Sequence, residues 1–327
     1  MNEINILILS AGRRVELVQR FQKAAQKLKI RSQIVAADCS DTAPALYIAD
    51  KACMLPPIHE QNYVESIIDT CIKEKIALIV PTIDTDLVLL AENRKVIEES
   101  SGAKVLISNT DVIKVCRDKI NTQHYLENHH FKIPKMYTSE EITTGNYTFP
   151  LFIKPKSGSS SINTFKVNSL NELKNALSIV HEPVIQDFME GEEFTIDVFL
   201  DFESKVITIA PRLRLATRSG EISKGKIIKD REVMDEVQRL MEVLKPIGHI
   251  TVQVMKTRKG IEFIEINPRF GGGAPMSIQS GADSCENLFR ILMGEQLTYN
   301  ENYRDDITFI RFDSSICLDE NKEIVEW

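Results

Sequence analysis

Short apolar runs alternate with amphipathic helical patterns through the first third of the chain, and this alternation restricts the possible folds more than any other feature of the sequence. Asn5–Leu9 is typical of a buried strand, and apolar side chains recur every three or four residues between Val15 and Leu28, as in a helix facing a core. Further strands are expected at Ser32–Ala37, Ala77–Val80 and Lys104–Ile107. This order indicates βαβ units, so we predict a parallel α/β domain over residues 1–110.

The pattern changes after Ile107, where the expected strands become antiparallel in character. These strands are Leu151–Lys154, Thr164–Val167, Val184–Asp187, Phe194–Leu200 and Val206–Ala210. Two later apolar runs, Thr251–Met255 and Ile261–Ile266, are expected to pair as a hairpin. The fold class predicted is therefore α/β followed by α+β with antiparallel sheets.

Composition excludes several classes of protein. The chain has 327 residues, enough for two or three compact units, and 40 Lys and Arg against 47 Asp and Glu give a net charge of −7, which disfavours nucleic acid as a partner. No apolar run approaches the roughly 20 residues that cross a bilayer. The first apolar run has no basic segment before it, so we expect a cytoplasmic protein without a membrane partner. Six cysteines, with no CxxC pair, are expected to be reduced.

The first candidate site is a lysine at the end of a strand, followed by a loop of small residues. Lys154 is followed by Ser157, Gly158 and Ser159. A fixed positive charge beside backbone N–H groups that carry no bulky side chains suits phosphate binding. The spacing is not that of the common phosphate loop GxxxxGK[ST]. A flexible surface hairpin is the alternative interpretation.

The second candidate is a strand that ends in an irregular segment, whose backbone groups can pair with a purine edge. The segment consists of Gln186, Asp187, Phe188 and Met189. Glu193 follows at a distance suited to accepting both hydroxyls of a ribose. An acidic turn between two strands is the alternative.

The third candidate is a set of oxygen ligands. Glu265 and Asn267 lie two residues apart on one expected strand, so both point to the same face, and Gln253 can face them from the hairpin partner. Hard oxygen donors with little charge suit Mg²⁺ that nucleotide phosphates also hold. Arg269 adds a forked donor for a phosphoryl group or carboxylate. A purely structural role is the less favoured alternative, because a buried glutamate needs a cation or partner.

Together these motifs resemble the ATP-grasp superfamily. The residues that carry the resemblance are Arg117-Asp118-Lys119, the Lys154 loop, Gln186 with Glu193, Gln253, and Glu265 to Arg269. The ordered set of motifs is similar to that of the large subunit of carbamoyl phosphate synthase and of short carboxylate–amine ligases. The resemblance covers nearly the whole chain. It implies a pre-ATP-grasp domain at 1–110, a lid region at 111–186 and a C-terminal lobe with the metal site at 187–327.

The resemblance also implies roles for single residues. Lys119 and Lys154 would hold the α- and β-phosphates of ATP, the segment from Gln186 to Met189 would meet adenine, and Glu193 would take the ribose. Gln253, Glu265 and Asn267 would bind one or two Mg²⁺, with Mn²⁺ as an alternative, and Arg269 would lie near the transferred phosphoryl. Gln186 stands where the family often has Glu. Family members are often dimers, so a homodimer is expected here.

The implied reaction follows from charge. A carboxylate is a poor electrophile toward an amine, so phosphorylation by ATP first converts it to an acyl phosphate, and phosphate is then the leaving group. This chemistry needs cations and positioning rather than a covalent nucleophile. We therefore expect an ADP-forming ligase acting on a small carboxylate and an amine, with Arg269, Lys154 and Arg218 as the catalytic cations. Arg214 and Arg218 are assigned to substrate or phosphate, with a solvated charged strand as the alternative.

Rival interpretations remain for the whole chain and for single residues. The opening strand–turn–helix imitates a nicotinamide-binding fold, but Ser10–Val15 has one glycine where GxGxxG needs three. A non-catalytic ATP-sensing module, or phosphorylation of bicarbonate toward carboxyphosphate or carbamoyl phosphate, would use the same motifs. Asp84 and Asp86 suit either a substrate ammonium or helix capping, and His249 is best read as a packed core histidine.

Overall fold

The computed structural model describes residues 3–156, 162–218 and 220–325. The chain begins with a five-stranded parallel sheet in the order β3-β2-β1-β4-β5. Its strands are β1 (Asn5–Leu9), β2 (Ile34–Asp38), β3 (Lys51–Met54), β4 (Ile76–Pro81) and β5 (Lys104–Val105). The predicted parallel α/β domain is confirmed. Because the strand order reverses between β1 and β4, the crevice outside their carboxyl ends is the usual ligand edge of such a sheet.

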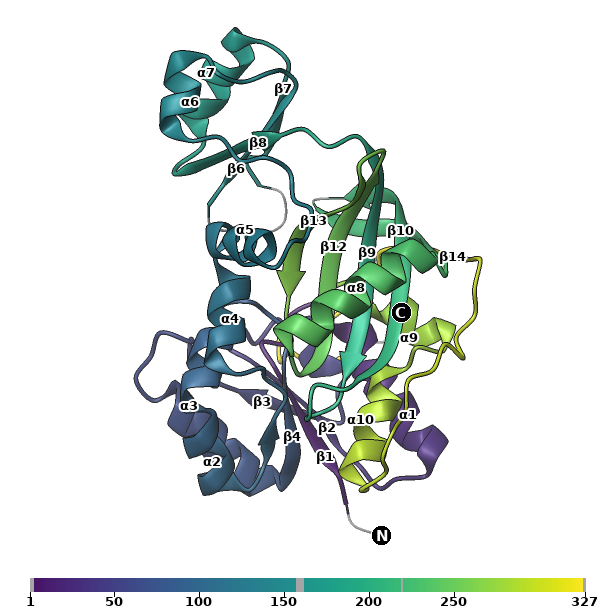
Figure 1. Ribbon diagram of the computed structural model, residues 1–327. Helices are drawn as coiled ribbons and strands as arrows, with labels where there is room; N and C mark the ends of the chain where they lie inside the picture. The colour runs from purple at the N-terminus through teal and green to yellow at the C-terminus, as the bar shows by residue number, and fades with distance from the viewer. Residues whose placement is uncertain (1–2, 157–161, 219, 326–327) are drawn as a thin grey trace.

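Helices cover both faces of this sheet (Figure 1). On one face lies α1 (Val15–Leu28), and on the other lie α2 (Tyr63–Glu74) and α3 (Asp86–Ser101). Each has an apolar stripe that packs on the buried strands, as with Phe21 of α1 and Leu90 of α3. Strand β3 was missed by the sequence prediction, because its partly exposed edge position leaves it without an apolar run.

A helical segment connects the first sheet to the rest of the chain. It contains α4 (Thr110–Arg117) and α5 (Lys119–Asn128), and both pack near β13 (Gly260–Asn267). Asn109 caps α4 by accepting a hydrogen bond from the backbone N–H of Val112, and the side chain of Asp118 caps α5. The tight turn between the helices thereby fixes Lys119 in the first turn of α5.

A small lobe projects from the body of the molecule (Figure 1). Its antiparallel sheet, in the order β7-β6-β8, is covered by α6 and α7 and has a hydrophobic core of its own. The elements are α6 (Ser139–Thr144), β6 (Leu151–Pro155), β7 (Phe165–Val167), α7 (Leu170–Ile179) and β8 (Pro183–Asp187). A separate core allows this lobe, which we call the lid, to move as a unit.

The largest sheet has six strands in the order β13-β12-β9-β10-β11-β14, all of them antiparallel to their neighbours. Its other strands are β9 (Gly191–Leu200), β10 (Val206–Arg218), β11 (Glu221–Ile227), β12 (Gly248–Thr257) and β14 (Ile307–Ile310). Helix α8 (Arg231–Leu244) packs on one face, while α9 (Ala274–Ser280) and α10 (Ser284–Leu292) lie on the other against α1. The six-stranded sheet thus shares a core with the first domain.

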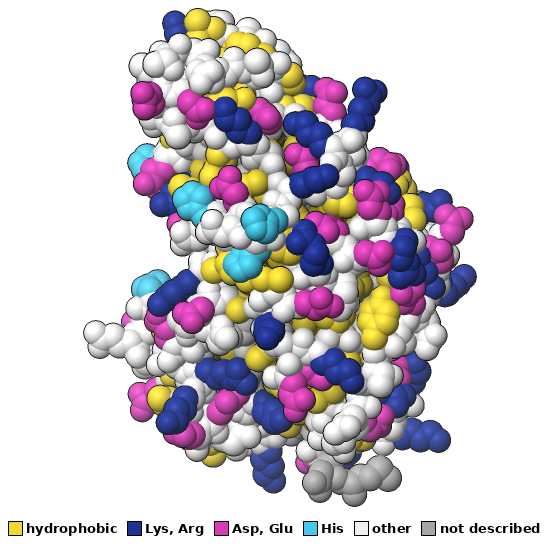
Figure 2. Space-filling model, in the orientation of Figure 1, with side chains coloured by type: hydrophobic (Ala, Val, Ile, Leu, Met, Phe, Trp, Pro, Cys, Tyr) yellow, Lys and Arg dark blue, Asp and Glu magenta, His cyan; other side chains and the backbone are white. Residues whose placement is uncertain are grey.

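On the face drawn in Figure 2, acidic and basic side chains are interspersed rather than separated into patches of one sign. Within the described part of the chain, none of the helices combines the length and apolar character needed to span a membrane.

Candidate nucleotide and metal site

A cavity of about 370 Å³ lies between the lid and the six-stranded sheet. It brings together residues that are more than 140 positions apart in the sequence. The predicted site residues that line it are Lys119, Lys154, Gln186, Phe188, Met189, Glu193, Gln253 and Glu265. Phe152, Ile162, Met255 and Ile264 add apolar walls. The cavity therefore combines apolar surface for a planar ring with cations at one end.

The two lysines form the cationic part of the cavity. Lys154 is buried near the end of β6, and burial, together with the charge of Lys119, lowers its pKa to about 8 while Glu265 opposes the shift. Burial also lowers the pKa of Lys119, whose ammonium donates a hydrogen bond to the carbonyl oxygen of Pro155 at 3.2 Å. Two ammonium groups so close together favour an anion between them.

Gln186 on β8 presents a buried amide to the cavity. Only 1% of the residue is exposed, and its Oε1 has no hydrogen-bond partner within the described chain. A buried acceptor without a donor is costly. An amino group on a planar ring would satisfy this oxygen, so the observed amide fits the predicted adenine contact.

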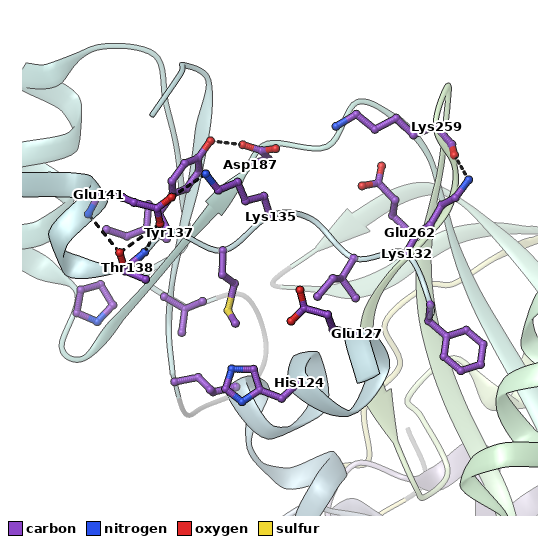
Figure 3. A pocket seen from close by; sticks show the side chains of 17 residues that line it. His124, Glu127, Lys132, Lys135, Tyr137, Thr138, Glu141, Asp187, Lys259 and Glu262 are labelled. Carbon is purple, nitrogen blue, oxygen red and sulfur yellow. Dashed lines mark hydrogen bonds and ion pairs between the residues drawn. The ribbon is translucent and has the colours of Figure 1, made fainter. Parts of the chain in front are cut away.

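The neighbouring Asp187 points to the other side of β8. Its carboxylate accepts a hydrogen bond from the hydroxyl of Tyr137 at 2.6 Å and lines a second cavity of about 870 Å³ (Figure 3). Only the backbone of Asp187 can therefore contribute to the first cavity, because alternate side chains of a strand face opposite ways.

Glu193 begins the long strand β9 and lines the cavity beside Arg214 of β10. The two side chains form an ion pair at 3.1 Å. Burial raises the pKa of Glu193, and Arg214 counteracts this rise. Arg214 also donates to the carbonyl oxygen of Gly220. Arg214 thus holds the Glu193 carboxylate in place. The sequence analysis had instead assigned Arg214 to substrate or phosphate.

The predicted metal ligands lie on the β12–β13 hairpin. Gln253 and Glu265 are directly opposite one another, and both line the cavity. Asn267 lies two residues beyond Glu265, is buried, and pairs with Thr251. The described residues contain no cluster of three or more His, Cys, Asp or Glu placed to hold a metal. One carboxylate with two amides therefore suits a hard cation that shares its coordination with phosphate oxygens.

Two further predicted site residues, Arg269 and Arg218, do not line this cavity. Arg269 forms an ion pair with Asp84 at 2.9 Å, and its buried Nε has no hydrogen-bond partner within the described chain. Arg218 is paired at the surface with Asp313 at 2.5 Å, so its catalytic role stays a prediction. The predicted loop residues Ser157, Gly158 and Ser159 lie outside the described residues.

A second polar region lies at the carboxyl ends of β1 and β4. Asp86 is fully buried, and its Oδ2 accepts a hydrogen bond from Ser10 at 2.7 Å while Oδ1 has no partner in the described chain. Burial raises the pKa of Asp86 to about 6. Helix α3 begins at Asp86, and its N-cap residue Thr85 forms no side-chain cap. Asp84 is paired with Arg269 and Arg117, but its buried Oδ1 likewise has no hydrogen-bond partner in the described chain.

Sequence reasoning missed several charged residues that meet in this region. They are Arg14, Glu221 and Arg311, and they lie near Arg117, which the sequence analysis had named only as part of the Arg117-Asp118-Lys119 motif. The position of Arg14 just after β1 was a usable signal, since loops at that edge bind ligands. Nothing local in the sequence marks Arg311 or Glu221. The predicted core histidine, His249, is buried and stacks on Phe270 with ring centroids 4.2 Å apart.

Comparisons with protein families agree with this geometry. Residues 6–107 match the PylC-like N-terminal domain, and residues 116–273 match the ATP-grasp domain. The chain therefore has an ATP-grasp domain preceded by a PylC-like N-terminal domain, and the predicted ATP-grasp resemblance is confirmed.

Curated relatives share part of the chain. D-alanine–D-alanine ligase from Francisella tularensis subsp. novicida is 30% identical over 169 residues, which are 47% of this chain and 57% of that protein. D-alanine–D-alanine ligase B from Clostridium perfringens is 27% identical over 52% of this chain and 63% of its own length. The chain thus spans less than two thirds of the length of these relatives.

Solved structures show the same fold at low identity. The biotin carboxylase domain of Hydrogenobacter thermophilus 2-oxoglutarate carboxylase has a TM-score of 0.71 at 18% identity, over 94% of this chain and 74% of that one. N5-carboxyaminoimidazole synthetase from Staphylococcus aureus, complexed with ADP, has a TM-score of 0.70 at 15% identity, over 90% and 79%. An L-amino acid ligase from Bacillus licheniformis has a TM-score of 0.66 at 18% identity, over 88% and 74%.

Proposed function

We propose that the chain is an ATP-dependent ligase that phosphorylates a small carboxylate and joins it to an amine, releasing ADP and phosphate. The observation that carries the proposal is the cavity beneath the lid, where two lysines, a buried unsatisfied amide and the Gln253–Glu265 pair converge. The relatives named as ligases of D-alanine support the reaction class, and the similar structure complexed with ADP supports the nucleotide.

The cavity suits ATP as the phosphoryl donor. Gln186 would accept a hydrogen bond from the amino group of adenine, and Phe188 and Met189 would contact the ring. Lys119 and Lys154 would bind phosphate oxygens, and Glu193 would meet the ribose. Gln253, Glu265 and Asn267 would hold one or two Mg²⁺, which offset phosphate charge and help to align the γ-phosphoryl group for transfer.

The reaction then proceeds in two balanced displacements. An oxygen of the substrate carboxylate attacks the γ-phosphorus, the bond to the β-phosphate oxygen breaks, and ADP leaves. The amine nitrogen next attacks the acyl carbon, the C–O bond to phosphate breaks, and the nitrogen loses a proton. Lys154 would stabilise the charge that builds up on ADP, and Arg269 that on the transferred group, since fixed cations act strongly in a site that excludes water.

Glu265→Gln should lower ADP formation about 100-fold at limiting Mg²⁺, because the amide keeps the size of the side chain but removes its charge. The assay couples ADP release to NADH oxidation while Mg²⁺ is titrated in the presence of pooled carboxylic acids and amines. Glu242→Gln, an exposed change on α8, is the matched control. An unchanged Mg²⁺ dependence in Glu265→Gln would place the metal elsewhere. If the unmodified protein forms no acid-dependent ADP, a nucleotide sensor is favoured over a ligase. Bicarbonate is tested separately as the acid, which distinguishes phosphorylation of bicarbonate from phosphorylation of an organic carboxylate.

Gln186→Leu should weaken ATP binding about 10-fold, as expected for the loss of one buried hydrogen bond. Gln186→Glu keeps an acceptor oxygen at the same place and should retain more of the affinity. The measurement is calorimetric titration of each folded variant with a non-hydrolysable ATP analogue. Equal affinities for Gln186→Leu and the unmodified protein would remove this residue from the adenine contact.

A further inference from the structure

Four arginines and two carboxylates form one cluster where the first domain meets the six-stranded sheet. Asp84 lies between Arg269 at 2.9 Å and Arg117 at 3.8 Å. Glu221 lies between Arg311 at 3.2 Å and Arg14 at 3.6 Å. Each carboxylate is therefore shared by two guanidinium groups, and each guanidinium keeps N–H donors that its carboxylate does not use.

The two halves of the cluster are in contact through Arg14. Its guanidinium reaches the carbonyl oxygen of Thr82 at 3.5 Å, and its electrostatic neighbours include Arg269 as well as Arg311. The loop after Arg269 lies directly against it: a Cβ atom on Gly272 would be 2.8 Å from Arg14 Nη1 and 2.7 Å from Glu221 Oε1. Glycine at this position lets the loop and the arginine approach so closely.

Within the ion pairs of the cluster, four guanidinium groups share two carboxylates. The partly exposed Glu16 lies 3.9 Å from Arg311, and Asp313 and the buried Asp86 are further acidic neighbours of Arg311 and of Asp84. Solvent reaches the centre poorly, since the Arg14 side chain is 22% exposed and that of Arg269 is 12% exposed. Cations held in such a place need anions, because dehydrating an unpaired charge is costly.

The cluster adjoins the cavity beneath the lid. Arg117 and Asp84 are electrostatic neighbours of Lys119, which lines that cavity, so the Asp84 half lies beside the lysines that would hold phosphate. The Glu221 half adjoins Arg269 through Arg14, and Gly220, the residue before Glu221, also lines the cavity. An anion bound by Arg14 and Arg311 would therefore lie close to the carboxylate that receives the phosphoryl without being that carboxylate.

We propose that Arg14 and Arg311 bind a second carboxylate of the substrates, one that is not activated, and so select substrates that carry it. This inference rests on the proposed ligase function. The second carboxylate belongs to the acid, as in a dicarboxylate, or to the amine, as in an amino acid. In both cases Arg14 and Arg311 are specificity-determining residues that position a substrate.

The test compares substrates that differ only in this group. Glutarate is compared with valerate by trapping the acyl phosphate with hydroxylamine, and alanine is compared with ethylamine in the complete ADP assay. The unmodified protein should use the carboxylate-bearing member of at least one pair with a kcat/KM at least 10-fold higher. Arg14→Gln and Arg311→Gln should raise the KM for that member at least 10-fold with little change in kcat, and should leave the other member unaffected.

The matched control is Arg31→Gln, because the side chain of Arg31 is 83% exposed and pairs with Glu3 rather than with a member of the cluster. Equal use of both members of each pair, or unchanged KM in both arginine variants, would overturn the inference while the ligase function stands. Calorimetric titration of glutarate and of alanine into the complex with a non-hydrolysable ATP analogue gives a readout without turnover. If no acid yields ADP, the ligase proposal fails. The titration then still tests the inference, which is overturned if neither glutarate nor alanine binds more weakly to Arg14→Gln than to the unmodified protein.

Discussion

Lys154→Ala is expected to lower acid-dependent ADP formation by 100-fold to 1,000-fold while the protein stays folded. The side chain is buried beside the cavity, where its pKa of about 8 reflects burial and the nearby charge of Lys119. Bound phosphate would favour the ammonium form, and the resulting contact forms in a place that water reaches poorly. Removing such a fixed charge typically costs a factor of about 10² to 10³ in rate.

The measurement is the turnover number at saturating Mg-ATP, with thermal unfolding to verify the fold. Lys174→Ala, an exposed change on α7 of the same lid, is the matched control and should retain full activity. Lys154→Arg separates charge from shape: it keeps a cation but needs more room than the cavity wall leaves. Turnover in Lys154→Ala within a few-fold of the unmodified protein would show that the phosphates bind elsewhere.

The fold followed from local pattern wherever a pattern was strong. The runs from Asn5 to Leu9 and from Ile261 to Ile266 are buried strands, as predicted, because their apolar residues match the burial that each sheet imposes. The edge strand β3 was missed because a partly exposed strand needs no apolar run. Strand β14 was also missed, although its sequence from Ile307 to Ile310 is largely apolar. Boundaries also shifted: of the predicted strand Lys104–Ile107, only Lys104–Val105 forms a strand.

The meeting of several predicted residues in one cavity beneath the lid was predictable to a similar degree, because they lie on strands whose alternation fixes the direction of each side chain. That alternation also explains Asp187, which must face away from the cavity if Gln186 faces it. The arginine cluster was beyond sequence reasoning. Arg14, Glu221 and Arg311 meet only through the packing of the first domain against the six-stranded sheet, and no local spacing encodes that contact.

Asp197→Ala should lower the free energy of unfolding by about 3–5 kcal/mol, because it removes one member of a charge pair that is buried beside the six-stranded sheet. Asp197 accepts hydrogen bonds from Arg212 and from Ser277, each at 2.5 Å, and both members of the ion pair are almost fully buried. Burial alone would raise the pKa of Asp197, but Arg212 and His249 lower it well below its usual range. Without this carboxylate, the Arg212 charge would be left buried and unpaired.

Asp313→Ala provides the control, because its ion pair with Arg218 has the same 2.5 Å separation but lies at the surface. Urea unfolding of both variants should show a large loss for Asp197→Ala and no resolvable change for Asp313→Ala, since solvent screens an exposed pair. Similar losses in the two variants would contradict a burial effect. Arg212 also binds the carbonyl oxygen of Gly273, four residues after Arg269. The buried pair therefore anchors the loop that follows Arg269 and packs against Arg14, and Asp197→Ala should raise substrate KM even where the variant remains folded.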